Sequence, residues 1–155
     1  MLFLPNYDSL IACCVDFIQK WVKSRMENVL LFTAILVMLE LFEVYMQRAD
    51  TLYGVMEKLY VWYSKSIFAF FLIHPAFYFT LFVVIVTDVL NIYMILLLAI
   101  KIFDLFYKIE LIKKIFIQQN VPSELAAMLE WKIPQWFFLM GVGLYPPLLF
   151  YALMG

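Results

Sequence analysis

The chain has 155 residues, of which 66% are hydrophobic, 19% aromatic and 15% charged, with a formal net charge of -1. Its mean hydropathy of +0.93 lies outside the range of a soluble domain, in which about a quarter of the residues are charged. The near-zero charge gives no indication of a nucleic-acid partner. Together these values predict a single domain that resides in a lipid bilayer.

The predicted fold is an all-α integral membrane bundle of four transmembrane helices, with two or three amphipathic helices at the interface. A hydrocarbon layer of about 30 Å requires about 20 apolar residues in a helix. Residues 7–24 place their polar groups on one face and carry Trp21, which predicts a helix in the headgroup plane. The first transmembrane helix is predicted over residues 27–46, which are apolar except for a few charged positions, notably Glu40 and Glu43.

Residues 50–65 contain four aromatic side chains and carry Glu57 near their centre, which predicts a second interfacial helix rather than a span. The second transmembrane helix is predicted over residues 66–87 and includes His74 followed by Pro75. Proline lacks an amide hydrogen and clashes with the preceding turn, so a kink is expected at this point.

The third transmembrane helix is predicted over residues 89–108, with a possible extension to residue 117. A short amphipathic helix is predicted over residues 123–132, after a run that contains a proline. The fourth transmembrane helix is predicted over residues 133–154. Residues that favour a bent or partly unwound helix lie in its middle: Gly141, Gly143, Pro146 and Pro147.

Ionisable residues lie inside three of the predicted spans. At about 1.5 Å per residue, Glu40, His74 and Lys101 each lie roughly 10 to 13 Å below the same membrane surface. Glu40 and Glu43 are three residues apart, as are Lys101 and Asp104, so each pair occupies one face of its helix. An isolated charge at this depth costs about 3 kcal/mol, so these groups are expected to face inward and to pair.

Two interpretations of this cluster remain open at this point. In the first, one of the two glutamates pairs with Lys101 while Asp104 pairs with Lys108 or His74, and the network fixes the helix register. In the second, the three carboxylates form a proton or cation pathway with His74 as a relay, assisted by carbonyl groups that the prolines of the last span leave free. A metal site is not predicted, because a single histidine is a weak indication and Lys101 would repel a cation.

The predicted function is that of a non-catalytic structural or accessory subunit of a larger membrane complex. Short connections, the lack of a soluble domain and the many Phe, Tyr and Met residues favour this interpretation. The alternative is an oligomeric proton or cation channel or transporter. Neither requires a cofactor, and the expected partners are the lipid bilayer and either other membrane subunits or further copies of the chain. The composition fits a mitochondrial inner or a bacterial inner membrane without deciding between them.

Overall fold

A computed structural model describes the backbone from Tyr7 to Gly155, and the side chains of residues 15, 16, 19, 20 and 26–155. This part of the chain is helical and has no strand beyond one isolated bridge between Thr51 and Lys132, which confirms the all-α class. The elements, in chain order, are α1 (Tyr7–Gln47), α2 (Leu52–Lys65), α3 (Ile67–Leu72), α4 (Pro75–Thr87), α5 (Ile92–Ile112), the π-helix η1 (Lys113–Ile117), α6 (Ser123–Leu129), α7 (Gln135–Phe138) and α8 (Met140–Met154).

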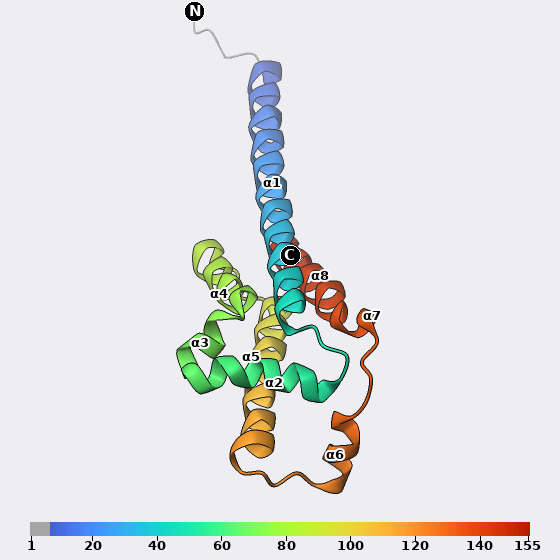
Figure 1. Ribbon diagram of the computed structural model, residues 1–155. Coiled ribbons are helices and arrows are strands. Elements are labelled where there is room, and N and C mark those ends of the chain that lie inside the picture. The colour runs from blue at the N-terminus through green and yellow to red at the C-terminus, as the bar shows by residue number, and fades with distance from the viewer. Residues whose placement is uncertain (1–6) are drawn as a thin grey trace, which may run out of the picture.

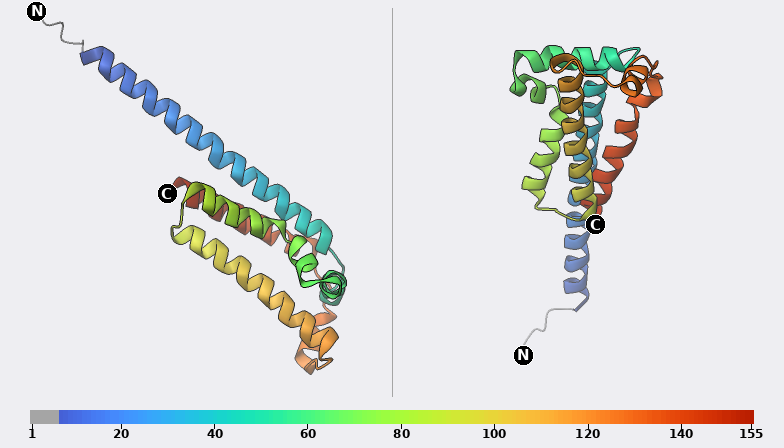
Figure 2. Two further views of the ribbon diagram at one scale, coloured as in Figure 1. Left: turned by 90° about the vertical axis from the view of Figure 1, so that its left-hand side faces the viewer. Right: turned by 90° about the horizontal axis from the view of Figure 1, so that it is seen from below.

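Helix α1 is continuous over 41 residues, where an interfacial helix over 7–24 and a separate span over 27–46 were expected. No glycine or proline occurs between Tyr7 and Gln47, so nothing in this segment interrupts the backbone hydrogen bonds. At 1.5 Å per residue the helix is about 61 Å long. Its N-terminal half extends beyond the other helices (Figure 2).

The segment over 66–87 is divided into α3 and α4 by a break at Ile73 and His74. Pro75 occupies the first position of α4, where its missing amide hydrogen costs nothing and its fixed φ suits a helix. The prolines at 146 and 147 act differently, because α8 remains helical through both of them. Gly141, Gly143, Pro146 and Pro147, where a bent or partly unwound helix was expected, therefore all lie within one continuous helix. The last segment turns instead at Leu139, whose amide bonds to the carbonyl of Trp136, three residues back, at 3.0 Å.

Helices α1 and α5 lie on opposite sides of the bundle, and α4 and α8 lie between them (Figure 2). Both α4 and α8 contact α1 as well as α5. Helix α2 lies across one end of this bundle (Figures 1 and 2). The chain entering α2 is held to the chain entering α7, since the amide of Ile133 donates to the carbonyl of Asp50 at 2.9 Å.

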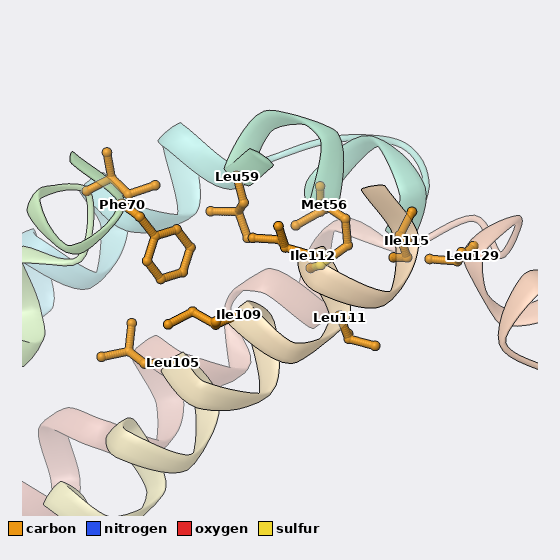
Figure 3. Packing of buried hydrophobic residues seen from close by; sticks show 11 residues of the cluster. Met56, Leu59, Phe70, Leu105, Ile109, Leu111, Ile112, Ile115 and Leu129 are labelled. Carbon is orange, nitrogen blue, oxygen red and sulfur yellow. The ribbon is translucent and has the colours of Figure 1, made fainter. Parts of the chain in front are cut away.

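The described side chains form two apolar clusters in the interior. The bundle cluster joins α1, α4, α5 and α8 and consists of Val29, Leu36, Ala76, Val83, Met94, Leu97, Leu149, Ala152 and Leu153. The cap cluster joins α2, α3, the C-terminal half of α5, η1 and α6 (Figure 3); it consists of Val55, Met56, Leu59, Phe70, Ile73, Leu105, Ile109, Leu111, Ile112, Ile115 and Leu129. The buried polar residues of α1 and α5 lie C-terminal to the bundle-cluster residues of the same helix, toward the end that α2 covers. They are Glu40, Glu43, Gln47 and Lys101.

Among the described residues, two segments, Met26–Gln47 and Gln135–Met154, are long and apolar enough to cross a membrane. Within an apolar window of each segment, 22% of the residues are buried. Helix α5 is long enough to cross a membrane, but the charged residues Lys101, Asp104 and Lys108 exclude it on composition. Helices α3 and α4 are each too short to cross. These findings support membrane association, and the bundle of four transmembrane helices stays a prediction.

Candidate functional site

A buried ion pair joins α1 to α5 through the middle of the bundle. The ammonium of Lys101 contacts Oε1 of Glu40, and the two residues are 5% and 4% exposed. Because α4 and α8 separate α1 from α5, only a long side chain such as lysine reaches the opposite helix. The structure therefore identifies Glu40, rather than Glu43, as the glutamate that pairs with Lys101.

Helix α8 completes the surroundings of this ion pair. The Lys101 ammonium lies 4.0 Å from the ring centroid of Tyr145, a cation–π geometry. A Cβ atom at Gly141 would lie 3.2 Å from Oε2 of Glu40 and 3.3 Å from Cε2 of Tyr145, which is too close without displacement. The glycine thus allows α8 to pass directly beside the Glu40 carboxylate. A Cβ atom at Gly143, two residues further on, would meet nothing within 4 Å.

Glu43 stabilises the start of α4. Its Oε1 accepts a hydrogen bond of 2.9 Å from the backbone amide of Ala76, the residue after Pro75. The first amides of a helix have no partner within the helix, and the helix dipole favours a negative charge at that end. Because the break at His74 starts a new helix at Pro75, the amide of Ala76 has no partner within α4. Glu43 on α1 supplies that partner.

His74 bonds to two neutral groups and not to a carboxylate. Its Nδ1 lies 3.0 Å from the carbonyl oxygen of Phe70, and its Nε2 lies 3.2 Å from the amide nitrogen of Gln47. A carbonyl oxygen can only accept, so Nδ1 carries the hydrogen and Nε2 accepts from Gln47. This arrangement corresponds to a neutral imidazole, and of the two partners expected for Asp104, Lys108 and His74, the structure pairs it with Lys108.

Gln47 connects the histidine to a second ion pair. Its Oε1 accepts from the ammonium of Lys108 at 3.1 Å, and that ammonium also lies 2.6 Å from Oδ2 of Asp104. The Asp104 side chain is 43% exposed, so this pair lies at the edge of the interior. Gln47 and Tyr145 were absent from the predicted site. Gln47 lies seven residues after Glu40, on the same face of α1, which is the signal that would have included it.

A partly open cavity of 420 Å³ borders this network and is lined by α1, α2, α5, α6, α7 and α8. Glu40, Glu43, Lys101 and Asp104 contribute to its polar lining, and Gly141 also borders it. His74, Pro75, Gly143, Pro146 and Pro147 do not line it. Within the described residues no group of three or more His, Cys, Asp or Glu side chains is placed to hold a metal ion.

The described side chains leave no buried nitrogen or oxygen atom without a hydrogen-bond partner. Chemically, the arrangement holds four helices in register and offers one amphipathic cavity beside a buried glutamate. No protein-family model, curated protein or solved structure matches this chain.

Proposed function

We propose that the chain is an integral membrane protein that crosses the bilayer with α1, α3–α4, α5 and α7–α8, and that it acts as a non-catalytic structural or accessory subunit of a larger membrane complex. One observation carries the proposal. The charged groups of the bundle interior bond to partners within the chain, whereas large apolar side chains dominate the outer faces of these helices.

The distribution of side chains supports the membrane location. Exposed residues on the bundle helices include Leu30 on α1, Ile85 on α4 and Phe103 on α5, all of which suit an acyl-chain environment. On α2, which lies across the end of the bundle, the ammonium of Lys65 lies 4.7 Å from the ring centroid of Trp62. Tryptophan and lysine at such a position are typical of the membrane interface.

The polar network supports a structural role. Helices in a bilayer gain little from apolar burial, so hydrogen bonds and small residues that allow close approach drive their association. The ion pair of Glu40 with Lys101, the bond from Ala76 to Glu43 and the close approach of α8 to Glu40 that Gly141 allows provide these features. Each of them joins two different helices, so the network fixes the register of α1, α4, α5 and α8.

Native mass spectrometry of the chain extracted in mild detergent from its source membrane tests this function. We expect stoichiometric association with at least one unrelated membrane chain. A chain that is only monomeric, or that associates only with its own copies, would contradict the subunit assignment.

An oligomeric proton or cation channel is the second candidate, and the cavity beside Glu43 and Asp104 is the observation that favours it. The two functions differ in ion flux through liposomes that contain the purified chain. The structural role predicts no proton or cation flux above that of empty liposomes. Flux that is abolished by Glu40→Gln or Asp104→Asn, in variants that keep their fold, would establish the channel instead.

A further inference from the structure

The cavity lined by α1 and α5 is partly open to the outside and is far larger than a packing defect. Its volume of 420 Å³ lies within the range of about 300 to 1,000 Å³ that is typical of small-molecule sites. It exists because α1 and α5 lie on opposite sides of the bundle and are bridged by long side chains rather than packed against each other (Figure 2). The space is therefore built into the arrangement of the helices.

The lining of the cavity is amphipathic. Its polar groups come mainly from the facing sides of α1 and α5. The walls that α2, α6 and α7 contribute are apolar and include Met56, Leu125 and Phe138. A molecule that fits this space must therefore have a polar group at one end and an apolar body at the other.

The charges around the cavity leave one carboxylate without a cation. Lys101 pairs with Glu40, and Lys108 pairs with Asp104. Glu43 forms no ion pair within 4 Å among the described residues, and the structure records only one hydrogen bond to it, from the amide of Ala76 to Oε1. Glu43 is 9% exposed and lines the cavity. The described part leaves no fully buried oxygen without a partner, so Oε2 of Glu43 keeps some accessible surface.

We propose that this cavity binds a compact amphipathic organic cation, with its ammonium group at the Glu43 carboxylate and its apolar body against α2, α6 and α7. Both lysines at the cavity are already paired, so the site lacks a free cation for an anionic ligand. The aromatic rings of Tyr107, Phe137 and Phe138, which also border the space, favour a ligand that contains a ring. This inference holds whether or not the chain is a subunit of a complex.

Binding of 3-phenylpropylamine to the full chain in phosphatidylcholine nanodiscs tests the proposal. Equilibrium dialysis measures the bound amine, with empty nanodiscs subtracted to remove partitioning into lipid. We expect saturable binding at one site per chain. The neutral 3-phenylpropan-1-ol and the anionic 3-phenylpropanoate share the ring and chain length, and each should bind at least about tenfold more weakly.

Two variants test the negative charge of Glu43 and the volume of the cavity separately. Glu43→Gln keeps an oxygen that accepts from Ala76 but removes the negative charge, and it should weaken amine binding about tenfold or more. Leu125→Trp fills the apolar wall and should also abolish saturable binding, with Glu43 intact. Glu57→Gln, on the exposed face of α2 and away from the cavity, should leave binding unchanged. Helix content by circular dichroism confirms that each variant is folded.

Three results would overturn the proposal. Absence of saturable amine binding would show that the cavity is not a ligand site of this kind. Equal binding of the amine and the alcohol would show an apolar occupant, such as an acyl chain. Unchanged amine affinity in folded Glu43→Gln would exclude Glu43 as the recognition group.

Discussion

Replacement of Lys101 by methionine tests the buried ion pair most directly. Methionine is similar in volume to the aliphatic part of lysine but cannot neutralise Glu40, which is 4% exposed. The carboxylate then has either to remain charged without a cation or to take up a proton. Removal of one member of a buried pair typically costs about 3–5 kcal/mol of stability, whereas replacement of both members by apolar residues is often neutral or stabilising.

The size of the effect follows from the cost of protonation. An ordinary glutamate, with a pKa of about 4.3, costs about 3.7 kcal/mol to protonate at pH 7 and about 1 kcal/mol at pH 5. We therefore expect Lys101→Met to be about 3–4 kcal/mol less stable than the double variant Glu40→Met/Lys101→Met at pH 7. The folded single variant holds one proton more than its unfolded state, so its stability rises as the pH falls. The difference between the two variants should shrink to about 1 kcal/mol at pH 5.

The assay is the free energy of unfolding in mixed micelles, measured by circular dichroism during titration with a denaturing detergent. Lys114→Met is the matched control, because Lys114 and Glu110 form a pair at 3.6 Å whose side chains are 45% and 56% exposed. An exposed pair of this kind contributes about 0–1 kcal/mol. Equal losses in Lys101→Met and in the double variant, or a difference that does not depend on pH, would refute the assignment of a stabilising buried pair.

Three further predictions concern the same network. Gly141→Ala should be less stable than Gly143→Ala, by about 1 kcal/mol or more, in the same micelle assay. Both variants gain helix propensity, but only the alanine methyl group at position 141 meets other atoms. Equal stabilities would argue against close passage of α8 beside Glu40. Glu43→Ala should lose about 1–2 kcal/mol through the unpaired amide of Ala76, and Glu43→Gln clearly less; equal losses would contradict the capping role. The ¹⁵N NMR spectrum of His74 at pH 7 should be that of a neutral ring with its hydrogen on Nδ1, and a doubly protonated ring would be inconsistent with the bonds to Phe70 and Gln47.

Several features of this protein follow from its sequence alone. Long apolar segments without glycine or proline form helices, as residues 27–46 do within α1, because the backbone must satisfy its own hydrogen bonds where side chains are apolar. The residue pair His74 and Pro75 predicts an interruption, since proline removes a helix donor. The spacing of Lys101 and Asp104 places both on one face of a helix, and the cost of an isolated charge directs that face inward.

The tertiary structure alone decided which groups meet. Lys101 reaches Glu40 because α1 and α5 lie on opposite sides of the bundle, a relation that no local pattern encodes across 61 residues. The partner of Glu43 is a backbone amide, and backbone donors have no signature in residue type, so only the position of α4 could identify it. The tertiary contacts likewise place the neutral Gln47 between His74 and Lys108. Composition and periodicity determine where helices form and which faces turn inward, whereas pairing depends on distances that exist only after the helices have packed.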